Sequence, residues 1–177
     1  GTASSTTVLY GDGTYKAEPG GGLILQVLSK HITTNVSVSI SGHTWTDFGV
    51  SLAITPASTG SKIWIQGNMS VGHWGYGGMR LVRDSTAIGV NTEGSPGSRA
   101  ICHAGNESHN QYTNLTFPIN WIDSPSTTSA VTYKYQFWYN TSGTIYLNRE
   151  YSDHDDGNRT YAVSTMTLAE LSAATIS

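Results

Sequence analysis

The sequence has little of three things that mark common protein classes: cysteine, charge and long apolar runs. Its 177 residues contain one cysteine, Cys102, which excludes an internal disulfide framework and a thiolate-rich zinc site. Only 12% of the residues are charged and the net charge is −3, which argues against the basic face of a general nucleic-acid-binding protein. No stretch approaches the roughly 20 apolar residues that span a bilayer, so we expect no membrane insertion.

The composition changes at residue 23. Residues 1–22 are rich in Gly, Ser and Thr, carry a turn signal at Gly11-Asp12-Gly13, and end in Pro19 and three glycines. Such a stretch cannot bury a core, so we predict an extended stalk end or linker over 1–22 and one domain over 23–177. Because the chain begins without Met, we expect a processed product or a piece of a longer protein.

From residue 23 onward, short apolar runs alternate with polar turns. In residues 36–40, apolar side chains alternate with serines, which is the period of a β-strand. The strongest strand signal is VTYKYQFWY at 131–139, whose three tyrosines and Phe137 fall on one face. We expect residues 145–147 to be its hairpin partner. Since no window shows a sustained helical stripe, the pattern predicts an all-β fold, an antiparallel β-sandwich or jelly roll.

Several blocks of the sequence resemble phage virion proteins. TTVLYGDGTYKAEP resembles the LRGDGTW-type segment that ends many tail-fibre stalks, with Tyr10 where Arg is common and Tyr15 where Trp is common. SLAITPASTGSKIWIQGNMS and MRLVRDSTAI resemble two further blocks of those proteins. TYKYQFWY, GTIYLNREY and STMTLAEL resemble their C-terminal hairpin and final strand. Together the blocks cover most of the chain, and their order and spacing resemble the C-terminal, receptor-binding head of a phage tail fibre.

This resemblance implies a homotrimeric virion protein that acts outside the cell. Its head would bind a glycan or lipopolysaccharide on the bacterial host, and its N-terminal side would contact other tail proteins. The alternative is an architectural virion protein, a capsid decoration or a tail adaptor, because the resembling blocks concern fold more than function. A large aromatic patch far from Gly1 favours host binding, whereas one beside Gly1 favours docking to the virion.

Two polar and aromatic stretches are candidate receptor-binding surfaces. Residues 72–78 set three large side chains between glycines, which predicts a loop that displays rings for stacking on sugars. The alternative is a strand whose Trp74 fills the core or a subunit interface. Residues 103–112 are predicted to form a polar surface loop, either a glycan contact or a solvated connection. The predicted receptor-binding residues are His73, Trp74, Tyr76, Asn106, His109, Asn110 and Tyr112.

The residue types that carry chemistry do not fall into a known catalytic or metal-binding pattern. The six histidines match no standard zinc spacing, so we predict no metal and no cofactor, the alternative being one axial histidine per chain of a trimer. We expect the acidic residues 153–156 to be a hydrated hairpin tip rather than a calcium loop. Cys102 and His103 are neighbours in a strand pattern and would point to opposite faces. We therefore predict that the protein is not an enzyme.

Sequons of the form N-x-S/T raise a secreted eukaryotic glycoprotein as a competing class. A chain rich in Asn, Ser and Thr contains such sequons without selection, and no disulfide framework accompanies them, so we favour the virion class. The sequons lie at Asn35, Asn68, Asn106, Asn114, Asn140 and Asn158.

Overall fold

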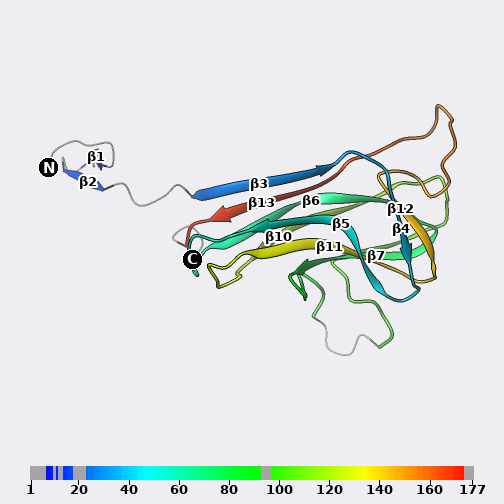
Figure 1. Ribbon diagram of the computed structural model, residues 1–177, viewed down its shortest axis with the longest axis horizontal. Helices are drawn as coiled ribbons and strands as arrows, with labels where there is room; N and C mark the ends of the chain where they lie inside the picture. The colour runs from blue at the N-terminus through cyan, green and yellow to red at the C-terminus, as the bar shows by residue number, and fades with distance from the viewer. Residues whose placement is uncertain (1–6, 10, 12–13, 18–22, 93–96, 174–177) are drawn as a thin grey trace.

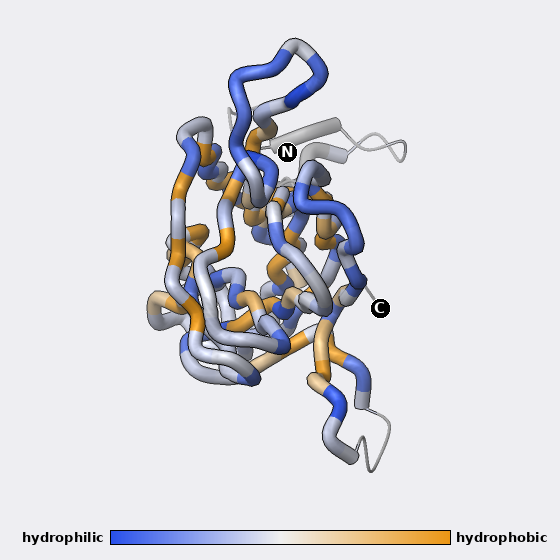
Figure 2. The backbone as a smooth tube through the Cα atoms, turned by 90° about the vertical axis from the view of Figure 1, so that its right-hand side faces the viewer, coloured by the Kyte–Doolittle hydropathy of each residue, from blue (hydrophilic) through white to orange (hydrophobic). Residues whose placement is uncertain are grey.

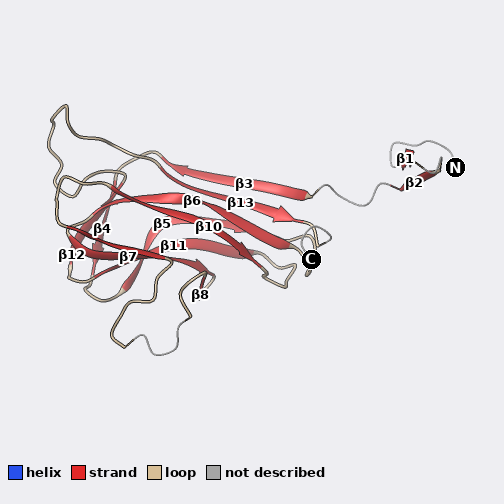
Figure 3. Cartoon of the chain, turned by 180° about the vertical axis from the view of Figure 1, so that it is seen from behind, coloured by secondary structure: helices blue, strands red, loops and turns tan. Residues whose placement is uncertain are grey.

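The computed structural model describes residues 7–9, 11, 14–17, 23–92 and 97–173. Within these ranges the chain forms strands and no helix, and so no helix long and apolar enough to cross a membrane (Figure 3). The strands are β1 (Thr7–Leu9), β2 (Tyr15–Ala17), β3 (Ile24–Ile32), β4 (Val36–Ile40), β5 (Trp45–Ile54), β6 (Lys62–Gly72), β7 (Gly75–Arg83), β8 (Thr86–Ile88), β9 (Ala104–Ser108), β10 (Leu115–Asp123), β11 (Val131–Tyr139), β12 (Gly143–Leu147) and β13 (Ser164–Leu171).

Two antiparallel sheets pack face to face (Figure 1). The large sheet has the order β3-β13-β6-β12-β4, with β10 along the other side of β6. The small sheet has the order β5-β11-β7, and β8 and β9 both pair with β7. The predicted antiparallel β-sandwich is confirmed.

The N-terminal segment contains a short hairpin. β1 and β2 pair with each other, with Thr7 opposite Ala17, and with no other strand in the described ranges. A pair of three-residue strands is too small to hold a core of its own. Of the turn predicted at residues 11–13, only Gly11 is among the described residues. The other residues of the segment that lie outside the described ranges are 1–6, 10 and 18–22. The division into a stalk segment and a head domain remains a prediction.

The sandwich has two distinct ends. β3 begins and β13 finishes at one of them, which we call the proximal end (Figure 1). Because neighbouring strands are antiparallel, six connections gather at the opposite, distal end. They are residues 33–35, 41–44, 73–74, 109–114, 140–142 and 148–163. Figure 2 views this end and shows hydrophilic to neutral loops in front of a more hydrophobic interior.

Strand β11 is the centre of the small sheet and the main source of the core. Its residues 133, 135, 137 and 139 are buried, and those between them are half-buried, which confirms the predicted alternation. From the large sheet, the inner residues of β6, β10, β12 and β13 pack against them. The largest fully buried side chains are Tyr133, Tyr135, Phe48, Phe117, Phe137, Ile63, Ile65, Met69, Met79, Leu81, Ile145 and Leu147.

The hydroxyl of Tyr133 is satisfied by an ion pair at the edge of the core. It donates a hydrogen bond of 2.7 Å to Asp123 Oδ2, and Arg83 Nη1 donates to both oxygens of that carboxylate at 3.0 and 2.8 Å. Burial and the neighbouring Asp123 raise the pKa of the Tyr133 phenol. A buried hydroxyl without a partner costs about 1–3 kcal/mol, so this network permits a polar group in the interior.

The hydroxyl of Tyr135 crosses to the large sheet, where it donates to the Thr165 carbonyl at 3.2 Å. Gly67 on β6 makes this crossing possible. A Cβ at Gly67 would overlap the Thr165 carbonyl and would lie 2.7 Å from Tyr135 Oη. Glycine is therefore required by close approach at this point of the sheet.

The expected hairpin between β11 and residues 145–147 is wrong. After Tyr139 the chain crosses from the small sheet to the large sheet, where β12 pairs with β4 and β6. Ile145 and Leu147 thereby enter the core from the sheet opposite β11. Alternation of side chains predicts which face is buried, but it does not predict which strand is the neighbour.

The long connection 148–163 passes over the distal end of β6. Gly72, the last residue of β6, is buried, and a Cβ there would overlap the backbone of residues 149–151. Arg149 stacks on the ring of Tyr146, with 3.6 Å from Cζ to the ring centroid, and this contact holds the start of the connection against β12.

We therefore expect Gly72→Ala to destabilise the protein. The added methyl group displaces residues 149–151, at a cost of about 1–3 kcal/mol in the free energy of unfolding. Gly157→Ala is the matched control, because no described heavy atom lies within 4 Å of that Cβ position in the same connection. Denaturant unfolding measures both variants. A Gly72→Ala protein as stable as the control would contradict this placement of the connection.

Candidate functional site

The predicted loop at 72–78 is instead a two-residue connection that crosses from the large sheet to the small sheet. β6 continues through Gly72 and β7 begins at Gly75, which leaves His73 and Trp74 as the whole connection. Trp74 is 48% exposed and Tyr76 is 53% exposed, as expected for surface rings. Tyr139 donates a hydrogen bond from its hydroxyl to the Trp74 carbonyl and fixes the turn on the sandwich.

His73 is not at the surface, contrary to its prediction as a receptor-binding residue. It is fully buried, with its ring centroid 5.3 Å from that of Phe137 and 6.2 Å from that of Phe117. Asn106 Oδ1 lies 2.9 Å from His73 Nε2 and accepts its hydrogen bond. Burial lowers the pKa of His73, although hydrogen bonds to Asn106 and to the Gly75 backbone oppose that shift. His73 thus packs the β6–β7 connection against β9, β10 and β11 at the distal end.

The predicted loop at 103–112 is partly a strand. Residues 104–108 form β9 along β7, with Asn106 opposite Gly77, so only His103 and residues 109–112 belong to connections. Polar residues such as Asn and Glu are poor strand formers, which is why the local signal predicted a loop. The side chain of Asn106 is half-buried over His73.

The other three predicted residues of this stretch face different surroundings. His109 is exposed, with Nε2 3.3 Å from Glu107 Oε2, and Asn110 is exposed but caps the turn by accepting a bond from the Tyr112 amide at 2.9 Å. Tyr112 is half-buried beneath Arg159, whose Cζ lies 4.0 Å from the ring centroid. Tyr112 therefore belongs to the packing of connection 148–163.

A hollow of about 450 Å³ lies beside Tyr76, and we call it the Tyr76 depression. Gly77, Gly78, Trp138 and Cys102 line it beside Tyr76. Its charged and polar lining residues are Arg99, Asn106, Glu107 and Asn140. A hydrogen bond from the Tyr76 hydroxyl to Glu107 raises the pKa of the phenol and fixes the ring. An apolar surface with convergent polar groups is typical of a small-molecule site.

A second hollow of about 360 Å³ adjoins the first, and we call it the Arg80 depression. Trp45, Trp138, His43 and Arg80 line it together with residues 98–101. The two depressions share Trp138, Arg99 and Ala100, so they form one continuous surface on the outer face of the small sheet.

A chain of hydrogen bonds supports Arg80 from the sheet beneath it. Asp47 accepts bonds from Lys134 Nζ at 2.8 Å and from Gln136 Nε2 at 2.6 Å. Gln136 Oε1 in turn accepts from Arg80 Nε at 2.9 Å and Nη2 at 2.6 Å, and Arg80 Cζ lies 4.3 Å from the ring centroid of Trp45. Burial tends to raise the pKa of Asp47, but the bonds from Lys134 and Gln136 outweigh it and lower the pKa.

Sequence reasoning missed Trp45, Arg80 and Trp138 as site residues. The sequence feature that indicates this surface is the outward face of residues 131–139. The alternation that buries the tyrosines turns Gln136 and Trp138 away from the core. A single outward tryptophan is ordinary, but Trp138 pairs across the strands with Trp45, and two adjacent rings form a patch that the sequence does not reveal without the strand order.

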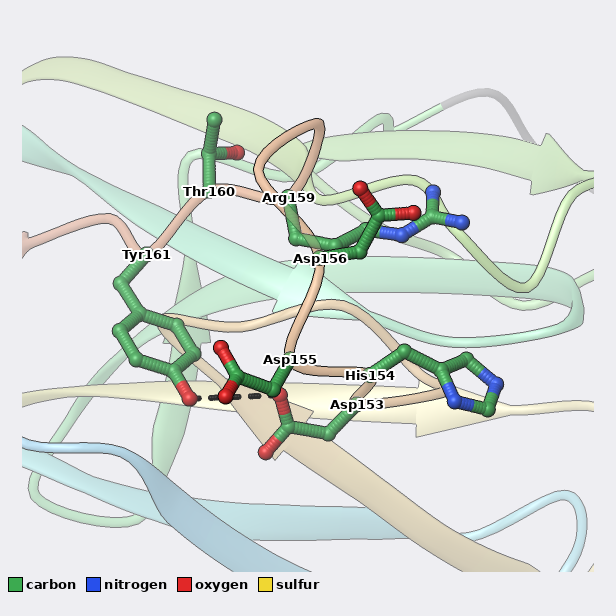
Figure 4. Close-up of a pocket in the computed structure, with 7 residues that line it drawn as sticks. All are labelled: Asp153, His154, Asp155, Asp156, Arg159, Thr160 and Tyr161. Atoms are coloured by element: carbon green, nitrogen blue, oxygen red, sulfur yellow. Dashed lines mark hydrogen bonds between the residues drawn. The ribbon is translucent and has the colours of Figure 1, made fainter.

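A third hollow of about 390 Å³ lies within connection 148–163. Figure 4 shows the hydrogen bond that Tyr161 donates to Asp153, at 3.3 Å, and the His154 ring turned away from it. The expected hairpin tip is instead part of a long connection, because β12 and β13 do not pair with each other. In the part of the chain that the structure describes, no three His, Cys, Asp or Glu side chains are arranged to hold a metal ion.

Cys102 and His103 do not form a nucleophile and base. His103 Nδ1 lies 2.7 Å from the Gly89 carbonyl, whereas Cys102 faces Gly78 and Gly105 in the Tyr76 depression. Burial raises the pKa of the Cys102 thiol, which disfavours the reactive thiolate.

We expect His73 to make stability depend on pH. The folded pKa lies below the ordinary value of 6.5, so the unfolded chain binds the proton more tightly. The stabilisation is complete above pH 6.5 and is lost as the pH falls towards the folded pKa. A shift of one unit corresponds to about 1.4 kcal/mol. His73→Phe should flatten this part of the profile, measured by thermal unfolding across pH, and His109→Asn should leave it unchanged. Superimposable profiles for wild type and His73→Phe would show that His73 is not buried neutral.

Comparison with known proteins supplies no family. A scan of the chain against protein-family models finds no match, and a search of curated proteins finds none either. The chemistry of the site itself is therefore what indicates a function.

Proposed function

We propose that this protein is the head of a phage tail fibre that binds a carbohydrate on the bacterial surface as a homotrimer. One observation carries the proposal: aromatic side chains and hydrogen-bonding groups converge in adjoining depressions near the distal end of the sandwich. The resemblance of the sequence blocks to tail-fibre heads agrees with it but does not establish it.

The chemistry of the Tyr76 depression suits a sugar ring. The flat, apolar faces of Tyr76 and Trp138 can stack on the C–H face of a pyranose, and their location beside glycine backbone leaves room for it. Asn106, Glu107 and Asn140 offer both donors and acceptors for sugar hydroxyls. A depression open to solvent fits recognition of a surface polymer rather than enclosure of a small metabolite.

The position of the depressions favours host binding over an architectural role. Tyr76 lies next to the start of β7 and Trp138 next to the end of β11, both at the distal end. The described chain enters the sandwich at the proximal end, where β3 begins (Figure 1). An adaptor would be expected to carry its largest aromatic surface near the proximal end.

The outer face of the large sheet supports self-association. Val27, Ala169, Trp64 and Ile122 are cross-strand neighbours and form one apolar row across four strands near the proximal end. Val27 and Ile122 remain substantially exposed. The next row towards the distal end is polar throughout, with Ser29, Thr167, Gln66 and Asn120. Burial of the apolar row between protomers would stabilise an oligomer by about 25 cal/mol per Å².

Light scattering tests the homotrimer. We expect the mass of the wild-type protein to be close to three times 18.9 kDa, and Ile122→Asp to shift it towards the monomer because a carboxylate would enter the apolar row. Asn120→Asp is the matched control, since it adds the same charge on the same strand in the polar row. A wild-type monomer at micromolar concentration would contradict the trimer.

Cell adsorption and glycan arrays test the binding surface. We expect Tyr76→Ala to weaken binding about tenfold or more per site, because stacking area and a fixed hydroxyl are lost. Three sites on one trimer would amplify that loss through avidity. Trp74→Ala and His109→Ala test the neighbouring residues that the sequence predicted for this surface. Tyr161→Ala is the control, because the Tyr161 side chain is 67% exposed but lines the third hollow instead.

Cys102 provides an independent measure of occupancy. It is the sole cysteine and lines the Tyr76 depression, so a bound saccharide should slow its reaction with a thiol reagent. Binding to purified virion components, together with undiminished cell adsorption by Tyr76→Ala, would favour the architectural alternative.

A further inference from the structure

We infer that the ligand is an acidic glycan, with an anionic substituent of one sugar bound in the Arg80 depression while a neighbouring sugar stacks in the Tyr76 depression. The inference rests on the proposed carbohydrate-binding function and names the class of carbohydrate.

The lining of the Arg80 depression is cationic. Arg80 and Arg99 both contribute to its wall, with His43 at one side, and its described lining contains no Asp or Glu. The nearest carboxylate in the hydrogen-bond chain is Asp47, whose two oxygens are taken by Lys134 and Gln136. Asp47 also attracts Arg80 without bonding to it, but Lys134 pairs with the same carboxylate, so the three groups together keep a net positive charge beside the depression.

Arg80 is held in place before any ligand arrives. Stacking on Trp45 fixes the plane of the guanidinium, and Gln136 Oε1 accepts from Nε and Nη2. This arrangement leaves Nη1 without a partner among the described residues. The Gln136 amide is itself oriented, because its Nε2 donates to Asp47. A guanidinium fixed in this way loses little side-chain entropy when it binds an oxyanion.

The two depressions differ in charge in a way that gives the ligand a direction. Arg99 lines both of them, but Glu107 offsets its charge in the Tyr76 depression, whereas Arg80 adds a second positive charge in the Arg80 depression. Trp138 and Ala100 belong to both linings, so a single oligosaccharide can contact both without crossing a barrier. A neutral sugar at Tyr76 followed by an acidic sugar at Arg80 matches this surface.

Calorimetry with matched ligands tests the inference. The probes are oligosaccharides that contain glucuronate or galacturonate, the same oligosaccharides with the carboxyl group reduced to the alcohol, and hexose phosphates. We expect the wild-type protein to bind acidic members more tightly than their neutral counterparts, and this preference to decrease as salt is added. Preference for the uronates identifies the anion as a carboxylate, and preference for the hexose phosphates identifies it as a phosphate.

Variants locate the preference. Arg80→Gln should weaken binding of the acidic ligands by about tenfold to a hundredfold, the usual value of a charge-assisted hydrogen bond, and leave the neutral ligands almost unaffected. Lys30→Gln removes the same charge outside both depressions, where Lys30 Nζ donates to the Gly49 carbonyl, and should change neither. Arg80→Lys keeps the positive charge but loses the planar guanidinium, so it should retain only part of the preference for acidic ligands. This variant provides the test if Arg80→Gln does not fold.

The outcomes separate this inference from the proposed function. Equal affinity of the wild-type protein for acidic and neutral ligands overturns the acidic ligand and leaves carbohydrate binding standing. So does an acidic preference that is undiminished in Arg80→Gln or, where that variant does not fold, undiminished in Arg80→Lys. Absence of binding to every saccharide overturns both.

Discussion

The sandwich depends on the burial of three tyrosines of one strand with every hydroxyl satisfied. The hydroxyls of Tyr133, Tyr135 and Tyr139 donate to Asp123, to the Thr165 carbonyl and to the Trp74 carbonyl. The first two partners belong to the large sheet and the third to the β6–β7 turn, so the bonds tie β11 to the opposite layer along its length. Loss of any partner would leave a buried hydroxyl without a hydrogen bond. Glycine is needed at position 67 because a side chain there would block the bond between Tyr135 and the Thr165 carbonyl.

The same strand also produces the candidate site. Its residues alternate, so the side chains between the buried tyrosines emerge on the outer face, where Gln136 orients Arg80 and Trp138 lines both depressions. Core and site are therefore coupled through one backbone. The rigidity that buried aromatics give to β11 is transmitted to the polar groups that would meet a ligand, which favours pre-organised recognition.

The alternation of residues 131–139 predicts the buried tyrosine face, because a period of two has one geometric meaning. The sandwich itself is predicted by the succession of short strands between polar turns along the chain. The alternation could not predict that β12 joins the other sheet, since the pattern carries no information about neighbours. Local composition also gave a wrong prediction of exposure at His73, and it placed Asn106 in a loop instead of a strand. A polar pair beside glycines indicates a loop, but here the two side chains satisfy each other inside the structure. Of the seven predicted site residues, Tyr76 and Asn106 line the Tyr76 depression. Arg80 became visible only when β5, β7 and β11 were placed side by side.

The long strands run between the proximal and distal ends, and this alignment has a mechanical consequence. A pull between a ligand held near Tyr76 and the start of β3 is directed along the strands (Figure 1). Such a load shears the hydrogen bonds between neighbouring strands together, whereas a load across the strands would open them one at a time. With β3 and β13 paired along eight residues of register, rupture requires many bonds to fail at once. The topology thus resists tension that is applied between the proximal and distal ends.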